Sequence, residues 1–192
     1  MRIEICGGIS AGKTTLAKSL ETLGYSCVYE DFSSIASLDD FYAEPETYNF
    51  ETELFFSLQH MYQFKKKCQT SDCIICDYSF EQDYAYAKHN MIGSEWKVFE
   101  SVFYEILTQI KNADLIIDLR CDPEILKERI VARGRINEKS ISVDYLKNTI
   151  DQVSNRLNEI STRVVYLDSS LYDLRDIEVV RKVVLPVIST YF

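Results

Sequence analysis

The sequence predicts an α/β fold in which helices cover both faces of one five-stranded parallel sheet. Short apolar runs rich in β-branched residues recur along the 192-residue chain, helical patterns lie between them, and hydrophobic residues make up 46% of the composition. Strands that alternate with helices form parallel sheets, because each crossover returns the chain to the same edge. The predicted strands are Arg2–Cys6, Ser26–Glu30, Cys73–Cys76, Leu115–Leu119 and Val164–Leu167.

A glycine-rich loop follows the first strand and opens the first helix. Its residues are Gly7-Gly8-Ile9-Ser10-Ala11-Gly12-Lys13-Thr14-Thr15, which fit the pattern Gly-x4-Gly-Lys-Thr in its context of strand, loop and helix. The glycines allow a tight turn, and the loop N–H groups then point at a phosphate together with the helix N-terminus. Lys13 adds a positive charge at the outer phosphates, and Thr14 offers a hydroxyl to Mg²⁺. Although glycine-rich turns join strands to helices in many folds, the context favours a P-loop NTPase-type three-layer fold that binds ATP and Mg²⁺.

The helix predicted from Tyr48 to Lys67 has two stripes of different character. One stripe is apolar and includes Leu54, Leu58 and Met61. The other mixes aromatic and polar side chains, namely Phe50, Glu53, Ser57, His60 and Phe64. A mixed stripe suits the wall of a ligand pocket and equally suits a partly exposed helix side, so the pattern alone leaves both interpretations open.

Three further helices are predicted in the second half of the chain. The segment Ser94–Lys111 carries a wide apolar surface, which indicates a helix that is either deeply buried or paired with another subunit. The segment Ser142–Ile160 has an ordinary core face. The last predicted helix, Asp176–Thr190, carries five valines and is expected to pack on the sheet.

Two acidic residues stand at predicted strand ends, where ligands bind in parallel sheets. Glu30 ends the second strand and is a candidate base that orients an attacking hydroxyl. Asp77 ends the third strand and is a candidate ligand for the magnesium hydration shell. A solvated acidic loop is the alternative for Glu30, and a helix N-cap is the alternative for Asp77.

An arginine-rich segment predicts a lid. Arg129 and Arg133 lie one helical turn apart, and Gly134 then frees the chain before Arg135. A flexible loop with arginines can close over a triphosphate and stabilise the charge that develops during transfer. The alternative is a helix C-terminus whose arginines complement the dipole. We expect one domain over residues 1–192 with a small lid at about residues 129–141.

Composition narrows the possible partners. The formal net charge is −9, from 30 acidic and 21 basic residues, which makes DNA or RNA a poor partner and favours a small-molecule substrate. The N-terminus leads directly into the first strand without a signal peptide, and no apolar run reaches membrane length. The six cysteines suit the core of a reduced cytoplasmic protein. Cys73 and Cys76 are three residues apart on a predicted strand, so they face opposite sides and are not expected to share a zinc ion.

These motifs, in this order and over nearly the whole chain, resemble the deoxynucleoside kinases. The matching positions are Gly7 to Thr15, Glu30, Phe41-Tyr42 before Glu44-Pro45, Asp77-Tyr78-Ser79 with Asp83, and the lid from Arg129 to Arg135 with Glu138. The phosphate loop is general to many enzymes, whereas the lid together with Tyr42 and Asp83 is considerably more specific. The resemblance implies transfer of the γ-phosphate of ATP to the 5′-hydroxyl of a 2′-deoxynucleoside in nucleotide salvage.

The resemblance also implies roles for individual residues. Glu30 would be the general base, and Tyr42 and Glu138 would hold the 3′-hydroxyl. Lys13 and the lid residues Arg129, Arg133 and Arg135 would contact donor phosphates. The loop Asp168-Ser169-Ser170 would border the donor adenine. Such kinases usually form dimers through helices like the one at residues 94–111, so a homodimer is expected here.

Three positions depart from the family pattern. Glu53 stands where a Gln usually reads the base edge, and His60 stands where an Arg is usual two turns later. Tyr78 replaces the Arg of the acidic-Arg-Ser motif, so the expectations are either a lower rate of catalysis or catalysis for which Lys13 and the lid suffice. Asp83 is retained, so the expected base pocket has lost two positive charges and kept its acid.

Glu53 suggests a preference among bases. An amide both donates and accepts hydrogen bonds, whereas an ionised carboxylate only accepts. Adenine and cytosine present a donor beside an acceptor, which suits Gln, and guanine presents two adjacent donors, which suits an ionised Glu. A purine, with guanine favoured, is therefore the hypothesis for the substrate. Protonation of Glu53 in a buried pocket would reverse the argument, because the neutral acid donates again.

Three other functions are compatible with a phosphate loop. A nucleoside monophosphate kinase must bind an additional phosphate, and Tyr78 and His60 remove the arginines best placed for it. A GTP-dependent switch is disfavoured because no Asn-Lys-x-Asp motif follows the fourth strand. A nucleotide-binding sensor with little catalysis is the alternative from another class, and Tyr78 is its best support.

Overall fold

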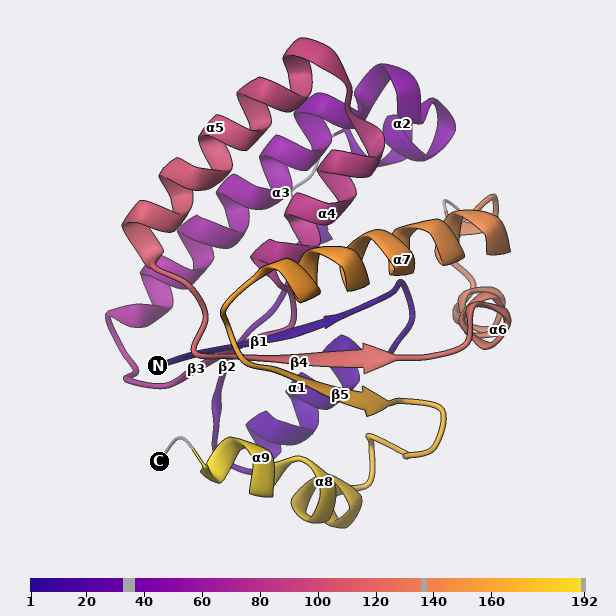
Figure 1. Cartoon of the computed structure of the whole chain (residues 1–192). Coiled ribbons are helices and arrows are strands. Elements are labelled where there is room, and N and C mark those ends of the chain that lie inside the picture. Colours follow the sequence, from indigo (N-terminus) through magenta and orange to yellow (C-terminus); the bar gives the residue numbers. More distant parts are fainter. Residues whose placement is uncertain (33–36, 136–137, 191–192) are drawn as a thin grey trace.

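A computed structural model of the chain, described over residues 1–32, 37–135 and 138–190, contains a five-stranded, all-parallel sheet in the order β2-β3-β1-β4-β5 (Figure 1). The strands are β1 (Arg2–Gly7), β2 (Ser26–Val28), β3 (Ile74–Cys76), β4 (Leu115–Arg120) and β5 (Val164–Asp168). Strand β1 is central, with Ile3 opposite Ile75 of β3 and Ile5 opposite Ile117 of β4. The α/β fold with a five-stranded parallel sheet is thus confirmed.

Helices cover both faces of the sheet. Figure 1 shows α1, α8 and α9 on one face, and α3, α4, α5 and α7 on the other. The bounds are α1 (Lys13–Thr22), α2 (Leu38–Ala43), α3 (Pro45–Cys68), α4 (Phe80–Asn90), α5 (Gly93–Ile110), α6 (Pro123–Arg133), α7 (Val143–Glu159), α8 (Ile177–Val183) and α9 (Leu185–Ser189). Within the described ranges, no helix combines the length and apolar character that a membrane span needs.

Two predicted elements differ from the observed ones. Strand β2 ends at Val28, so Glu30 lies two residues beyond the strand and not at its last position. The last predicted helix is two helices, because Pro186 lies in the first turn of α9. Proline has no N–H to donate to the preceding turn and its ring clashes with that turn, so α8 ends at Val183.

Helix α3 turns its mixed stripe inward. Glu53, Ser57 and His60 are buried, whereas Phe55 is 42% exposed and Leu58 is 45% exposed on the opposite side. Polar side chains are costly to bury without partners. The inward polar stripe therefore indicates that this side of α3 has a use other than packing.

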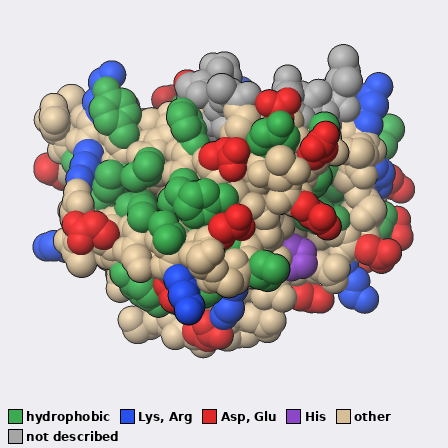
Figure 2. Space-filling model, turned by 90° about the horizontal axis from the view of Figure 1, so that it is seen from above, with side chains coloured by type: hydrophobic (Ala, Val, Ile, Leu, Met, Phe, Trp, Pro, Cys, Tyr) green, Lys and Arg blue, Asp and Glu red, His purple; other side chains and the backbone are tan. Residues whose placement is uncertain are grey.

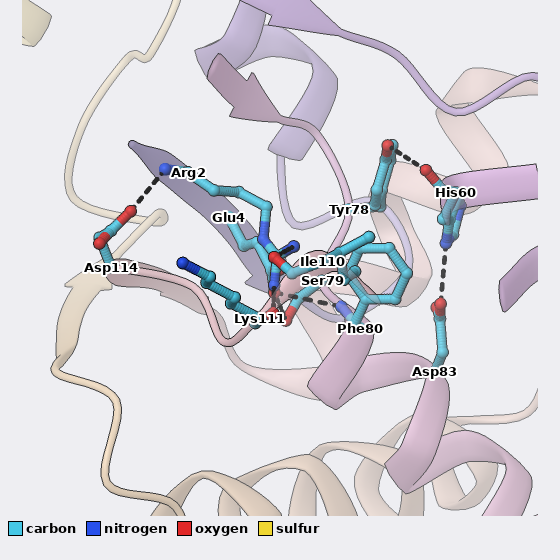
Figure 3. A network of polar contacts seen from close by, with 10 residues as sticks. All are labelled: Arg2, Glu4, His60, Tyr78, Ser79, Phe80, Asp83, Ile110, Lys111 and Asp114. Carbon is cyan, nitrogen blue, oxygen red and sulfur yellow. Dashed lines mark hydrogen bonds and ion pairs between the residues drawn. The ribbon is translucent and has the colours of Figure 1, made fainter. Parts of the chain in front are cut away.

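A buried ion pair on β1 fixes the start of α4 (Figure 3). Arg2 Nε lies 2.8 Å from Glu4 Oε1, and both side chains are almost fully buried. Glu4 Oε2 accepts hydrogen bonds from the Ser79 hydroxyl at 2.8 Å and from the Phe80 N–H at 3.1 Å. Arg2 also donates to the backbone oxygens that end α5. The first turn of α4 is thereby attached to the central strand, which sets the position of the residues that follow on this helix.

Candidate active site

A cavity of about 260 Å³ opens at the carboxyl end of β1. Its walls come from the phosphate loop, the segment after β2, the helices α2, α3, α4 and α7, and the lid. The expected site residues that line it are Ile9, Ser10, Ala11, Gly12, Lys13, Thr14, Thr15, Glu30, Tyr42, Glu53, Asp83, Arg129, Arg133, Arg135 and Glu138. Segments that are far apart in the sequence therefore meet around one space, as the strand-end rule predicts.

The phosphate loop has the shape that anion binding requires. Gly12 has φ 104° and precedes α1, and Gly7 has φ 141°. A Cβ on Gly7 would lie 2.7 Å from the Leu119 backbone oxygen, and a Cβ on Gly8 would lie 2.9 Å from Leu126 Cδ1. At Gly7, only glycine fits this close approach of the loop to the sheet. Lys13 Nζ donates to Gly7 O at 2.7 Å and lies 3.3 Å from Gly8 O, so its charge is held over the loop.

Asp77 connects the loop to the candidate base. The Glu30 N–H donates to Asp77 Oδ1 at 2.6 Å, and the Thr14 hydroxyl donates to the same carboxylate. Burial raises the pKa of Asp77, and these hydrogen bonds oppose the shift. Asp77 lies outside the cavity wall, one layer behind Thr14. A hydroxyl beside a carboxylate is a hard-oxygen donor set, which fits Mg²⁺ bound through water and substrate phosphates.

Three acidic side chains also line the cavity. Glu30, Glu53 and Asp83 all face it, from the segment after β2, from α3 and from α4. Asn90 Nδ2 donates to Glu53 Oε1 at 2.9 Å. Burial raises the pKa of Glu53 to about 8, and the nearby charges of Asp83 and Glu30 add to this effect. Glu53 is therefore mainly protonated at neutral pH.

Two expected substrate ligands lie one layer behind the wall (Figure 3). His60 is 1% exposed and Tyr78 is 2% exposed, and neither lines the cavity. His60 Nδ1 lies 2.8 Å from Asp83 Oδ2, and the Tyr78 hydroxyl donates to the His60 backbone oxygen at 3.0 Å. The structure therefore places both residues against the protein groups of the site and not against the cavity itself.

The lid arginines are held by protein partners. Arg133 and Arg135 both pair with Glu138, the latter at 3.1 Å between Nη1 and Oε1. Arg129 donates to the Ser169 hydroxyl at 3.2 Å and to the Ser169 backbone oxygen at 2.9 Å. Tyr42 of α2 lines the same cavity as Glu138, and burial together with the charge of Glu138 raises the pKa of its hydroxyl. Residues 136 and 137 of the predicted lid lie outside the described residues.

A second cavity, of about 490 Å³, lies beside the phosphate loop on the side of β5. The loop after β5 lines it from Ser169 to Arg175, together with Arg129 and Thr15. Asp168 is not in its wall and accepts hydrogen bonds from the Ser170 N–H at 2.8 Å and from the Ser170 hydroxyl at 2.6 Å. These bonds lower the pKa of Asp168. The expected adenine contact thus falls to the residues that follow Asp168.

Several wall residues were not singled out from the sequence, namely Phe32, Leu38, Phe56, Gln82, Tyr86 and Tyr145. For two of them, the spacing along a helix could have predicted a place in the site. Phe56 and Tyr86 lie three residues after Glu53 and Asp83 on the same helices, so they share a face with these acids. Gln82 Oε1 accepts the Gly7 N–H at 3.0 Å. Tyr145 comes from α7, and no local pattern connects that helix to the site.

The fold and this site define a P-loop phosphotransferase, with a phosphate loop and several carboxylates around one cavity. The chain belongs to the deoxynucleoside kinase family, whose model matches residues 3–191. A deoxyadenosine kinase of Dictyostelium discoideum is 30% identical over 165 residues, which cover 83% of this chain and 67% of the relative. A deoxyguanosine kinase of Bacillus subtilis (strain 168) is 28% identical over 167 residues, which cover 82% of this chain and 79% of the relative. The chain is thus a nucleotide-binding kinase that acts on a deoxynucleoside.

Solved structures show the same fold. A deoxyadenosine kinase from M. mycoides with bound dCTP superposes with a TM-score of 0.79 at 21% identity, over 95% of this chain and 97% of that chain. The same enzyme with bound dATP gives a TM-score of 0.77 at 20% identity, over 95% and 97% of the two chains. The likeness in structure therefore extends beyond the sheet to nearly all elements.

Proposed function

We propose that this kinase transfers the γ-phosphate of ATP to the 5′-hydroxyl of a purine 2′-deoxynucleoside, in nucleotide salvage. The observation that carries the proposal is that Lys13 of the phosphate loop and the Glu30 carboxylate face the same cavity. A donor phosphate on the loop and a sugar hydroxyl beside Glu30 would meet in that space. Holding the two reactants in one orientation supplies much of the catalysis of phosphoryl transfer.

The residues present suit the steps of that reaction. Glu30 accepts the hydroxyl proton, while Lys13 and the lid arginines Arg129, Arg133 and Arg135 stabilise the charge of the transferring phosphoryl group. Thr14 directly, and Asp77 through the water shell, would hold Mg²⁺, which would supply positive charge to the phosphates. On the sugar, Tyr42 and Glu138 are the candidates for the 3′-hydroxyl. When Glu138 turns to the sugar, the arginines it holds become available to the donor phosphates.

The protonation state of Glu53 bears on the choice of base. With its pKa raised to about 8 by burial, the neutral acid both donates and accepts near pH 7, as an amide would. This state fits the adjacent donor and acceptor of adenine and equally those of cytosine, and it removes the advantage of guanine expected from an ionised Glu53; the preference for a purine is taken from the relatives. Both relatives described above are named for purine deoxynucleosides, one for deoxyadenosine and one for deoxyguanosine.

The charge of the cavity disfavours a nucleoside monophosphate as acceptor. Its four Lys and Arg side chains belong to the phosphate loop and the lid, whereas Glu30, Glu53 and Asp83 face the acceptor end. An acceptor that carries a phosphate would meet these acids without a cation of its own, so a neutral nucleoside is the better fit.

The proposal also covers the domain organisation, the oligomeric state and the cellular setting of the protein. We propose one functional domain over residues 1–192 with its lid at about 129–141, and a homodimer formed through the helix at residues 94–111. The net charge of −9 supports a protein without a nucleic-acid partner. All six cysteines are described and are free thiols, which supports a reducing, cytoplasmic setting.

Substrate-dependent ADP release from the variant Glu30→Gln tests the proposal. We expect turnover to fall by about 100-fold or more, because the amide no longer accepts the hydroxyl proton. The shift of the melting temperature by ATP should persist, because the phosphate loop is intact. Glu128→Gln, on an exposed position of α6, is the matched control and should behave as the wild type. Full turnover by Glu30→Gln contradicts the role of Glu30, and wild-type binding of ATP without turnover of any of the four common deoxynucleosides favours the sensor.

A further inference from the structure

The acidic side chains of the cavity need a positive charge close by. Glu30, Glu53 and Asp83 face one space, and like charges at short range in a partly dry site raise the free energy of the ionised state. Glu53 avoids this repulsion by protonation. Glu30 and Asp83 are left as two carboxylates that would repel each other unless a cation lies between them.

His60 is placed between these two carboxylates. It projects from the middle of α3, with Nδ1 2.8 Å from Asp83 Oδ2 and Nε2 3.4 Å from Glu30 Oε1. Figure 3 shows its ring directed at Asp83, which comes from α4. An imidazolium has one N–H on each side of the ring, so a single protonated His60 faces both acids.

Tyr78 fixes the plane of the imidazole ring. The two rings are stacked with centroids 3.8 Å apart and 4° between their planes. The Tyr78 hydroxyl donates to the His60 backbone oxygen at 3.0 Å, so the same side chain holds both ends of the residue. Phe56 and Phe80 close the remaining sides at centroid distances of 5.9 Å and 6.1 Å. The direction of Nε2 is therefore set by packing.

The surroundings favour the charged form of His60. Burial lowers its pKa, but the carboxylates of Asp83 and Glu30 outweigh this effect and raise the pKa to about 10. The titratable groups that face the ring are Glu30, Asp83, Tyr78 and, on its own helix, Glu53. Tyr78 does not compete for the proton, because burial raises the pKa of its phenol well above the ordinary value.

The contact with Glu30 is electrostatic and leaves that carboxylate free to react. His60 Nε2 is buried, and among the described residues it has no partner within hydrogen-bonding geometry. At 3.4 Å it attracts Glu30 Oε1 without a well-formed hydrogen bond. The backbone N–H of Glu30 is separately tied to Asp77 at 2.6 Å. Glu30 is thus held from two sides, while its carboxylate still faces the cavity.

We propose that His60 is a positioning residue of phosphoryl transfer, whose imidazolium bridges Asp83 and Glu30 and holds the Glu30 carboxylate toward the 5′-hydroxyl. This inference rests on the proposed role of Glu30 as base. In that step the hydroxyl proton passes to Glu30, the bond from O5′ to the γ-phosphorus forms, and the bond from that phosphorus to the bridging oxygen breaks to release ADP. Tyr78, which stands where the family pattern has an Arg, supplies the surface that orients the cation.

Kinetics of His60→Gln as a function of pH tests the role. Glutamine keeps a hydrogen-bond donor and loses the charge. We expect kcat to fall roughly tenfold or more with the KM for ATP unchanged. The acid limb of the pH profile of kcat should move up by about one pH unit or more, because a carboxylate without a neighbouring cation is protonated more easily. His60→Arg, which restores a cation that can stack on Tyr78, should recover most of both effects.

The second histidine provides the control. His89→Gln makes the same chemical change at an exposed position of α4 and should leave kcat and its pH profile as in the wild type. A His60→Gln enzyme whose pH profile matches the wild type overturns the inference, even if kcat is lower, because a purely structural role lowers kcat without moving the acid limb.

The protonation state of His60 can also be measured directly in the wild-type protein. The chain has two histidines, so ¹⁵N-histidine NMR of the wild type and of His89→Gln assigns both rings. We expect His60 to carry protons on both nitrogens at pH 8, and a neutral tautomer at that pH overturns the inference without any need for a folded His60 variant. Absence of ADP release from the wild type with every deoxynucleoside would instead overturn the proposed function and the kinetic role with it, while NMR would still report whether the bridge exists.

Discussion

Glu53 is the residue whose protonation connects the site to its choice of base. With a pKa of about 8, the side chain is a donor and acceptor below that pH and only an acceptor above it. We expect the ratio of kcat/KM for deoxyguanosine to that for deoxyadenosine to rise roughly tenfold between pH 6.5 and pH 9. This change corresponds to one hydrogen bond that deoxyguanosine gains and one that deoxyadenosine loses when Glu53 ionises. Steady-state assays of the two nucleosides across this range measure the ratio.

Two glutamine variants isolate the effect of this carboxyl group. Glu53→Gln cannot ionise, so its ratio should stay flat and favour deoxyadenosine at every pH. Glu51→Gln changes an exposed residue two positions earlier on α3 and should keep the rise seen in the wild type. A wild-type ratio that does not change with pH would show that Glu53 does not read the base.

Single residues also show which contacts of the site the sequence does not predict. The resemblance to the deoxynucleoside kinases placed Glu53 and Asp83 in one expected base pocket, whereas the helical period alone left the orientation of α3 open. Neither revealed that His60 pairs with Asp83, since that contact depends on how closely α3 and α4 pack. Asn90, the partner of Glu53, and Tyr145 of α7 belong to elements that no local pattern connects to the site. Contacts that depend only on how the helices pack against one another therefore cannot be predicted from the sequence.

At the scale of elements, the phosphate loop depends on the conformation of Gly7. We expect Gly7→Ala to abolish the thermal shift produced by ATP and to lower stability, because the added Cβ meets the Leu119 backbone oxygen at 2.7 Å and the φ of 141° is strained for alanine. Thermal denaturation with and without ATP measures both effects.

Gly24 provides a matched substitution away from the loop. It has φ 94°, but a Cβ there has no atom within 4 Å. Gly24→Ala should therefore cost stability of about 1 kcal/mol from backbone strain alone and leave the ATP-induced shift intact. An ATP response in Gly7→Ala equal to that of Gly24→Ala would show that the loop does not bind phosphate in the way we describe.

Helices and strands were predictable where the residue composition and the hydrophobic period indicate the same structure. The five strands are short and apolar, and the phosphate loop has fixed glycines, so both follow from local sequence. Helix α2 (Leu38–Ala43) has only six residues, too few for a periodic signal, and it was not foreseen. The division of the last helix at Pro186 had a signal in the proline itself, which five nearby valines outweighed. The orientation of α3 was left open because both of its stripes contain large apolar residues.

The whole molecule separates charge along one cavity. The chain is acidic, with a net charge of −9, yet Lys13 and the lid arginines gather at the phosphate end. Glu30, Glu53 and Asp83 come from the segment after β2, from α3 and from α4, whereas Glu138 is paired with two of these arginines. This separation favours an anionic donor and an uncharged acceptor in a fixed relative orientation. It arises only when the sheet brings the segments after β1, β2 and β3 to one edge, so composition alone does not show it.

The outer surface of α3 and α5 is the best candidate for the homodimer. Figure 2 views this surface and shows hydrophobic side chains gathered on it. Phe55, Leu58 and Tyr62 of α3 and Val98 of α5 are all at least 42% exposed. The inner face of α5 is used within the monomer, because Phe99, Phe103, Ile106 and Ile110 are buried. The inner part of the apolar surface predicted for residues 94–111 thus belongs to the core, and the exposed apolar side chains come from both α3 and α5.

The variant Leu58→Glu tests this surface. In a dimer with twofold symmetry, each substitution places two carboxylates in the interface, so we expect the dissociation constant to rise at least about tenfold, which is about 1.4 kcal/mol per dimer. Sedimentation equilibrium of the wild type and the variant measures this change. Val131→Glu introduces the same charge at a 60% exposed position of α6, away from α3 and α5, and should keep the wild-type assembly. A wild type that remains monomeric at high concentration would exclude α3 and α5 as a dimer interface. Equal dissociation constants for all three proteins would exclude them too, because a buried leucine contact cannot accept two carboxylates without cost.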